Sequence, residues 1–191
     1  MPVVLLALVA AMASCALPTR PPAPARPLAS PQELPGLPNF ARISPALYRG
    51  GQPTREGFER LKQMGVRTIV DLRGQIHREP LEGLDLKYVH VPSDVAHPDE
   101  QKIAQFLRIV GDPANQPVFV HGTLGAHRTG CYVAAYRIVE QRWSARDAEL
   151  EMRRFHFSPY WKGITDFLNA LDPLEMRERI RAIPPTTRTS R

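Results

Sequence analysis

The 191-residue sequence has only two cysteines, Cys15 and Cys131. Two cysteines cannot build the disulfide framework that stabilises many small secreted domains, and no spacing of cysteine and histidine fits a zinc site. We therefore predict neither a disulfide scaffold nor a bound metal. Nothing in the sequence indicates a cofactor.

Runs of lysine and arginine interleaved with aromatic residues are also missing, although the formal net charge is +6. Such runs are typical of nucleic-acid-binding surfaces, so we predict no nucleic-acid partner. The basic balance, with a pI near 9.7, instead favours anionic partners such as phosphorylated ligands or an anionic membrane face.

No hydrophobic run is long enough for a membrane-spanning helix, which takes about 20 residues. The apolar run at residues 2–13 has the length of the hydrophobic core of an export signal. Small residues precede Cys15, as in bacterial lipoprotein signals. We predict a signal peptide over residues 1–15, lipidation of Cys15, and a protein anchored by this lipid in the bacterial cell envelope. One alternative is ordinary signal-peptide cleavage after Ala13, which would give a periplasmic protein. The other is that the start of the coding sequence is assigned incorrectly.

Prolines are abundant but unevenly placed, since eight of the 20 lie between Pro18 and Pro38. Proline has no backbone N–H to donate to a helix or a sheet, so this stretch is expected to stay extended. We predict a Pro-rich linker over residues 16–39, a folded domain over residues 40–172 and a frayed, basic tail over residues 173–191.

Strand and helix patterns alternate along the folded part. Strands are predicted at Ile43–Tyr48, Val66–Leu72, Leu86–Val91 and Val118–Val120, and helices at Thr54–Met64, Asp99–Val110, Thr129–Gln141, Ser144–Met152 and Gly163–Leu171. Such alternation predicts an α/β fold whose central, mostly parallel sheet is flanked by helices.

A glycine-containing loop joins the strand at Val118–Val120 to the helix that follows. The first backbone N–H groups of a helix have no partner within it, and the helix dipole is positive there, so anions bind at such a place. Arg128 adds a planar guanidinium that can hold two phosphate oxygens. A plain turn with a surface arginine is the alternative. The predicted phosphate-binding residues are Thr123, Leu124, Gly125, Ala126, His127 and Arg128.

The segment from His121 to Gly130 resembles the signature of the dual-specificity branch of the protein tyrosine phosphatases. That signature is His-Cys, five residues, then Arg-Thr/Ser-Gly. Residues 48–53, 65–73 and 88–94 resemble the same family, and the continuation through Cys131 is most similar to the plant and fungal atypical dual-specificity phosphatases. Some members of that group act on inositol pyrophosphates. The resemblance spans residues 40–171 and implies the cysteine-phosphatase fold.

The resemblance also implies roles for individual residues. Gly122 stands where the family has its nucleophilic cysteine, whose thiolate attacks phosphorus. Asp94, 28 residues before Gly122, is the expected general acid, with Asp99 as the second candidate and a helix cap as the alternative for either. Thr129 matches the hydroxyl that helps the cysteine leave, and His121 matches a residue that orients the loop.

Glycine at position 122 has no side chain, so the phosphocysteine intermediate cannot form there. Cys131, in the following helix, is interpreted as a small buried hydrophobe and not as a substitute. Three hypotheses stay open. In the first, the chain is an inactive pseudophosphatase that binds a phosphorylated protein or an inositol polyphosphate. In the second, it is an active phosphatase whose cysteine at 122 was lost by engineering or sequence error. In the third, it is a non-catalytic structural protein of the envelope.

Overall fold

The computed structural model describes residues 27–76 and 78–184. Its centre is a six-stranded sheet in the order β1-β2-β3-β6-β4-β5. The four strands from β3 to β5 are parallel, whereas β1 and β2 are antiparallel to their neighbours. The strands are β1 (Gln32–Leu34), β2 (Leu37–Arg42), β3 (Leu47–Gly50), β4 (Thr68–Asp71), β5 (Lys87–His90) and β6 (Val118–His121).

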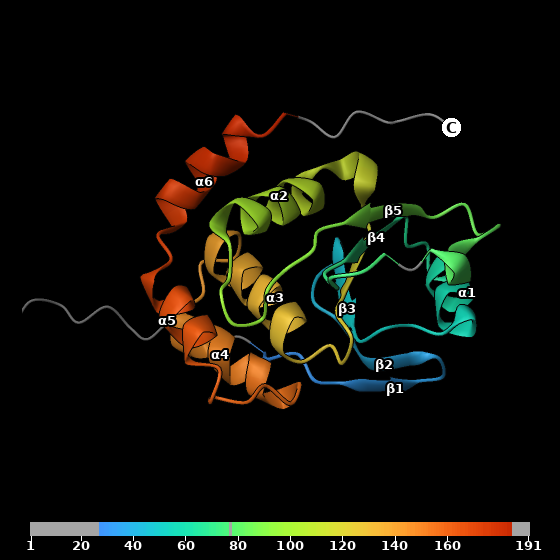
Figure 1. The fold of residues 1–191 in the computed structure, drawn as a ribbon, viewed down its shortest axis with the longest axis horizontal. Coiled ribbons are helices and arrows are strands. Elements are labelled where there is room, and N and C mark those ends of the chain that lie inside the picture. The colour runs from blue at the N-terminus through green and yellow to red at the C-terminus, as the bar shows by residue number, and fades with distance from the viewer. Residues whose placement is uncertain (1–26, 77, 185–191) are drawn as a thin grey trace, which may run out of the picture.

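Helices cover both faces of this sheet, as the sequence predicts. Figure 1 shows α1 on one side and the remaining helices on the other. The helices are α1 (Arg55–Gln63), α2 (Glu100–Gly111), α3 (His127–Val139), α4 (Ala145–Arg154), α5 (Lys162–Ala170) and α6 (Pro173–Ala182), with short 3-10 helices at Glu79–Leu81 and Pro113–Asn115.

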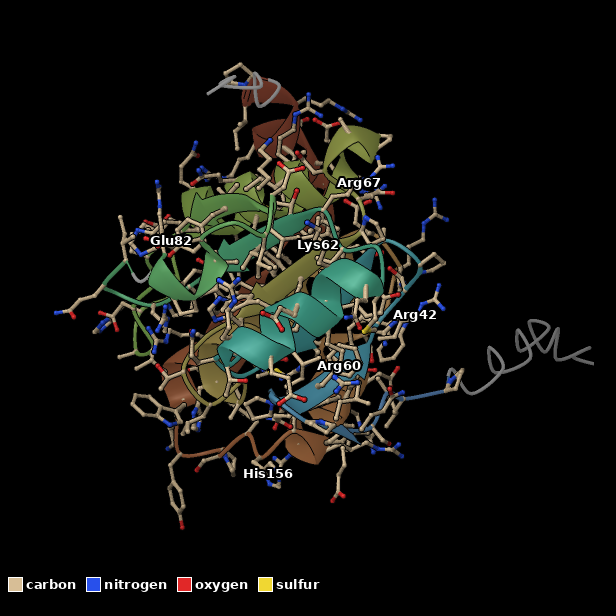
Figure 2. All side chains as sticks on the ribbon, turned by 90° about the vertical axis from the view of Figure 1, so that its right-hand side faces the viewer. Arg42, Arg60, Lys62, Arg67, Glu82 and His156 are labelled. Atoms are coloured by element: carbon tan, nitrogen blue, oxygen red, sulfur yellow. The ribbon has the colours of Figure 1, made fainter. Side chains whose placement is uncertain are left out.

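The central strands β3, β6 and β4 are buried on both faces, because helices cover both sides of the sheet and successive side chains of a strand point to opposite sides. Ile69 and Phe119 join the apolar cluster under α1, whereas Val70 joins the larger cluster under α2 and α3. α1 is amphipathic: Phe58 is buried, while Arg60 lies on the outer face of the helix (Figure 2). The predicted α/β class and the flanked, mostly parallel sheet are confirmed.

Three predicted helix starts are confirmed by their caps. The Thr54 hydroxyl accepts a hydrogen bond from the Gly57 N–H (3.3 Å), and the Ser144 hydroxyl accepts one from the Asp147 N–H (3.0 Å). An Asp99 carboxylate oxygen accepts from the backbone at the start of α2, which is the capping role that the sequence left open for it.

The predicted first strand is wrong. Residues 43–46 form the turn between β2 and β3, and the strand begins only at Leu47. Ile43 is buried, but its side chain packs in the core from a turn, so its apolar character gave a misleading strand pattern.

Both ends of the predicted domain need correction. The predicted linker 16–39 overlaps β1 and the start of β2, because Gly36, at φ 76°, closes a turn between them and Leu37 is buried in the core. The predicted frayed tail begins with α6, which Asp172 caps and Pro173 starts. Met176 anchors this helix, since only 2 % of its surface is exposed. Residues 16–26 of the linker, the signal peptide and Cys15 lie outside the described residues.

No helix of the described residues has the length and apolar character needed to cross a membrane.

Candidate functional site

The glycine-containing loop lies at the carboxyl end of β6, at the centre of the parallel part of the sheet. This edge is where open α/β sheets bind ligands. α3 starts directly after the loop at His127, and no side chain caps its first turn. The first N–H groups of α3 are therefore free of side-chain caps at the place where an anion would sit.

Residues of the loop surround a pocket of about 400 Å³. Only two other parts of the described chain contribute to its lining, Val95 and Trp161. The lining from the loop and α3 consists of Gly122, Thr123, Leu124, Gly125, Ala126, His127, Arg128 and Thr129. The structure thus brings all six predicted phosphate-binding residues to one pocket.

Two hydrogen bonds hold the Arg128 guanidinium over this loop. One amino group donates to the Leu72 carbonyl at the end of β4, and the other donates to the Thr123 hydroxyl, both at 3.2 Å. The Thr129 hydroxyl is buried and donates to the Gly50 carbonyl at 3.4 Å. Arg128 is thereby oriented before any ligand arrives, as phosphate recognition requires.

Gly122 adopts a backbone conformation that any residue can take. A Cβ atom built there would lie 3.3 Å from the Thr129 hydroxyl and 3.9 Å from Nε of Arg128. A side chain at position 122 would therefore extend toward the Thr129 hydroxyl and the Arg128 guanidinium.

Asp94, the expected acid, follows β5 on the loop that also supplies Val95 to the pocket. Its carboxylate accepts a hydrogen bond from the Ala96 N–H (2.8 Å) and lies 3.3 Å from Nδ1 of His97. The Ala96 bond and then the His97 contact lower the pKa of Asp94. The Asp94 side chain does not line the pocket in this arrangement.

His121, at the end of β6, is fully buried. Its Nδ1 lies 3.3 Å from the Gly122 carbonyl and 3.9 Å from the Asp71 carboxylate. Burial lowers the pKa of His121 to about 4, so the ring is neutral at pH 7. The ring packs against Phe58 and Phe119 and fixes the start of the loop from behind.

Asp71 was missed from the sequence. Burial alone would raise the pKa of its carboxyl, but hydrogen bonds from Arg73 and Tyr88 and the nearby His121 lower it to about 2. Its carboxylate binds Arg73 through two oxygens and accepts from the Tyr88 hydroxyl at 2.7 Å. A charged residue at the end of a strongly apolar strand pattern indicates a buried carboxylate, and this feature of the sequence could have identified Asp71.

Cys131 is a buried free thiol in α3. Burial raises its pKa to about 12, which leaves it protonated and unreactive. Among the described residues, no group of three or more His, Cys, Asp or Glu side chains is arranged to hold a metal ion.

A family model described as "DSP-PTPase phosphatase fused to NAD+ Kinase" matches residues 38–158. The chain belongs to this family. The match confirms the predicted membership of the dual-specificity phosphatases. The matched residues include β3, the segment Tyr48–Pro53 that overlaps its end, and the whole glycine-containing loop.

Individual relatives agree with the family. The chain is 32% identical over 120 residues to the dual specificity protein phosphatase TpbA of Pseudomonas aeruginosa, covering 62% of this chain and 55% of that protein. It is 30% identical over 136 residues to the inositol diphosphatase SIW14 of Saccharomyces cerevisiae, covering 62% and 46%. The matched part thus spans only about half of each of these two relatives.

Solved structures of the same two proteins have this fold. The crystal structure of P. aeruginosa TpbA superimposes with a TM-score of 0.71 at 26% identity, covering 85% of this chain and 99% of that chain. The catalytic core of SIW14 in complex with citrate gives a TM-score of 0.69 at 25% identity, covering 78% and 95%. A variant of TpbA has also been solved in complex with pTyr.

Proposed function

We propose that this dual-specificity phosphatase family member binds phosphorylated groups in the loop pocket without hydrolysing them. One observation carries the proposal: Arg128 and the uncapped first turn of α3 are in place around a Gly122 that has no side chain. Binding needs only the guanidinium and the backbone N–H groups. Hydrolysis through a phosphocysteine needs a thiolate as well.

Loss of the thiolate favours binding. In an active relative the thiolate faces the phosphate with a like charge, and its removal takes away that repulsion. The positive charge of Arg128 and the helix dipole then act on the phosphate alone. A pocket of this kind holds a phosphorylated partner without cleaving it.

The alternative is an active phosphatase in a form of the chain with cysteine at 122. In that form the thiolate attacks phosphorus, the phosphorus–oxygen bond of the ester breaks, and an acid on the Asp94 loop protonates the leaving oxygen. Water then hydrolyses the phosphocysteine, with Thr129 supporting the departing thiolate. Asp94 must first release Ala96 and His97 to take part.

The pocket rim favours an aryl phosphate over an inositol polyphosphate. Leu124, which exposes 70% of its surface, lines the pocket together with Val95 and Trp161, so part of the lining is apolar and aromatic. Arg128 and His127 are the basic side chains of the lining, and burial followed by the Arg128 charge lowers the pKa of His127. A polyphosphate with many charges would need more cations, so we propose phosphotyrosine on a protein as the ligand.

The test is the substitution Gly122→Cys, with Gly122→Ser as the matched control. The chain as it stands should not hydrolyse phosphotyrosine, Gly122→Cys should acquire turnover, and Gly122→Ser should stay inactive. Measurable turnover by the unsubstituted chain would contradict the proposal. If Gly122→Cys folds but stays inactive, and neither form binds phosphate, the structural role in the envelope gains support.

We also propose that the protein reaches the cell envelope through a lipid on Cys15. The run of apolar and small residues before Cys15 supports this localisation. Expression in a bacterium fed labelled palmitate should label the full chain but not Cys15→Ser. Equal labelling of both, or labelling of neither, would overturn the lipid anchor.

A further inference from the structure

A fully buried arginine lies behind the phosphate loop. Arg49 is on β3, whose register places it beside Val120 of β6, two residues before Gly122. None of its surface is exposed. Burying a guanidinium costs free energy, so its presence at this place calls for a physical reason.

The Arg49 guanidinium touches the loop directly. One amino group donates a hydrogen bond to the Gly125 carbonyl, and the guanidinium lies 3.8 Å from the centre of the Phe155 ring at the end of α4. The Nε and Nη1 atoms are buried without a hydrogen-bond partner. No ion pair among the described residues includes Arg49.

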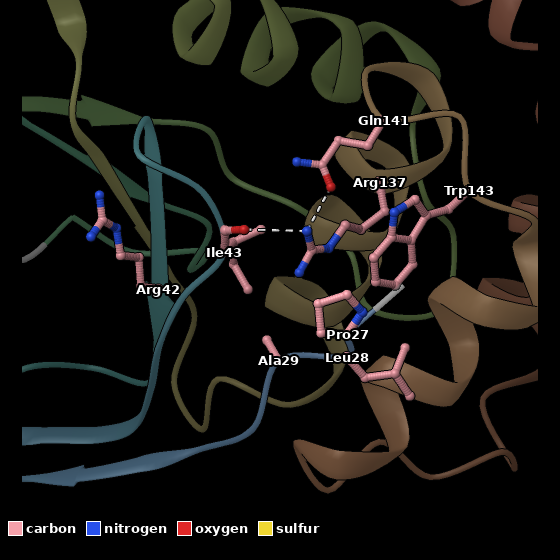
Figure 3. A pocket seen from close by; sticks show the side chains of 8 residues that line it. All are labelled: Pro27, Leu28, Ala29, Arg42, Ile43, Arg137, Gln141 and Trp143. Atoms are coloured by element: carbon pink, nitrogen blue, oxygen red, sulfur yellow. Dashed lines mark hydrogen bonds between the residues drawn. The ribbon is translucent and has the colours of Figure 1, made fainter. Parts of the chain in front are cut away.

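Glu151 is the carboxylate whose charge raises the pKa of Arg49, but it already forms an ion pair with another arginine. Glu151 of α4 binds Arg137 of α3 through two oxygens, at 2.7 and 2.9 Å. Arg137 is itself held by the Ile43 carbonyl at 3.2 Å and lies over the Trp143 ring (Figure 3). Arg49 therefore lacks a counter-ion of its own, and burial lowers its pKa to about 9, which still leaves it charged at pH 7.

Arg49 is one of three donors that hold consecutive carbonyls of the loop from behind. The three bonds run from the Gln52 N–H to the Thr123 carbonyl (2.9 Å), from the Asn39 amide to the Leu124 carbonyl (3.2 Å), and from Arg49 to the Gly125 carbonyl. In a planar trans peptide the C=O and the following N–H point in opposite directions. Carbonyls held toward β2 and β3 therefore turn the next N–H groups away from those strands, to the pocket side of the loop.

We propose that Arg49 is a positioning residue of the phosphate site, which fixes the Gly125–Ala126 peptide with its N–H toward the ligand and places a second, unpaired positive charge beneath it. The inference rests on the proposed phosphate-binding function. A bound phosphate supplies the counter-ion that the free protein lacks. The cost of burying Arg49 in the free state is thus offset when the ligand binds.

The experiment compares Arg49→Met, which removes charge and donor, with Arg49→Lys, which keeps the charge. Titration calorimetry of the full chain with inorganic phosphate and with phosphotyrosine should show about tenfold weaker binding for Arg49→Met. Arg49→Lys should recover part of that loss. The melting temperature of Arg49→Met without ligand should equal or exceed that of the unsubstituted chain, since a buried charge is gone.

A second readout does not depend on phosphate binding. In a Gly122→Cys background, the pH dependence of iodoacetamide alkylation reports the pKa of the introduced thiol. Arg49→Met should raise that pKa by about one unit, because a nearby positive charge stabilises the thiolate. Arg42→Met is the matched control: it removes an exposed arginine of β2 that makes no contact with the loop in the described residues, and it should leave the thiol pKa unchanged.

An unchanged thiol pKa in Arg49→Met, or in Arg49→Gln if the methionine variant does not fold, would overturn the buried-charge proposal, because both substitutions remove the positive charge. Unchanged phosphate affinity in these variants would overturn the positioning role. Absence of phosphate binding by the unsubstituted chain would count against the proposed function alone, because the thiol readout still tests Arg49.

Discussion

Gly122 and Gly125 stand in the same loop, but the backbone requires only one of them. Gly125 has φ 74°, and a Cβ atom there would lie 2.5 Å from the Gly51 nitrogen. Gly122 has no positive φ, and the nearest atom to a Cβ there would be the Thr129 hydroxyl at 3.3 Å, a tight contact that a small shift of this side chain relieves. Position 125 is therefore glycine for reasons of shape, whereas no backbone requirement explains glycine at 122.

This difference predicts opposite outcomes for two alanine substitutions. Gly122→Ala should leave the free energy of unfolding nearly unchanged, whereas Gly125→Ala should lower it by about 1–3 kcal/mol through left-handed strain and the clash with Gly51. Urea unfolding of both variants measures the difference. Equal stability of the two would show that the loop does not hold the described conformation.

His121 makes stability depend on pH. The pKa of His121 is about 4 in the folded protein against an ordinary value of 6.5, so the folded state prefers the neutral ring. This preference adds about 3 kcal/mol to the free energy of unfolding. The contribution is complete above pH 6.5 and is lost as the pH falls toward 4. His121→Asn should flatten the fall in melting temperature over this range. His97→Asn, with His97 largely exposed, is the control and should not.

At the scale of elements, the start of α5 packs against the loop that carries Asp94. A Cβ atom on Gly163 would lie 2.3 Å from the Ala96 carbonyl. The same short segment includes Trp161, which lines the pocket. α5 therefore fixes both an edge of the pocket and the backbone next to the expected acid.

Gly163→Ala should displace the Asp94 loop. In a Gly122→Cys background it should lower kcat by about tenfold, the effect of a poorly placed general acid, with a smaller change in phosphate affinity. Gly111→Ala is the matched control, because a Cβ atom at Gly111 meets nothing within 4 Å. If both variants keep full kcat, the contact with α5 does not position the acid loop.

Elements with local signals were readable from the sequence. The caps at Thr54 and Ser144 and the apolar runs of β4 and β6 depend on neighbouring residues. The helices α1 to α5 and the strands β4, β5 and β6 were therefore predicted to within a few residues, whereas α6 was not. β1 was missed because prolines dominate its surroundings. Its pairing with β2 depends on the turn at Gly36 and on the burial of Leu37, which local pattern does not show.

Some residues of the candidate site could likewise be predicted from local sequence, whereas others could not. The loop and Arg128 follow each other in sequence and were predicted together. The donors Asn39 and Arg49 lie 85 and 76 residues before the carbonyls that they hold. Only the sheet order, which places β2 and β3 beside β6, brings them behind the loop.

At the scale of the whole molecule, the N-terminal side of the described chain is tied to the helical layer. The Ala29 N–H donates to Glu151 at 2.8 Å, and Arg154 donates to the Leu28 carbonyl and the Ser30 hydroxyl. Residues 28–30 therefore lie beside α4, and Phe155 at the end of α4 contacts Arg49.

The central claim is that the intact fold holds a phosphate group but does not cleave it. Phosphorus NMR of phosphotyrosine mixed with the full chain tests both halves in one sample. We expect the phosphotyrosine resonance to shift or broaden, no inorganic phosphate signal to grow, and the change to disappear in Arg128→Ala but not in Arg146→Ala, an exposed arginine of α4. A growing inorganic phosphate signal, or a resonance unaffected by the protein, would contradict the account.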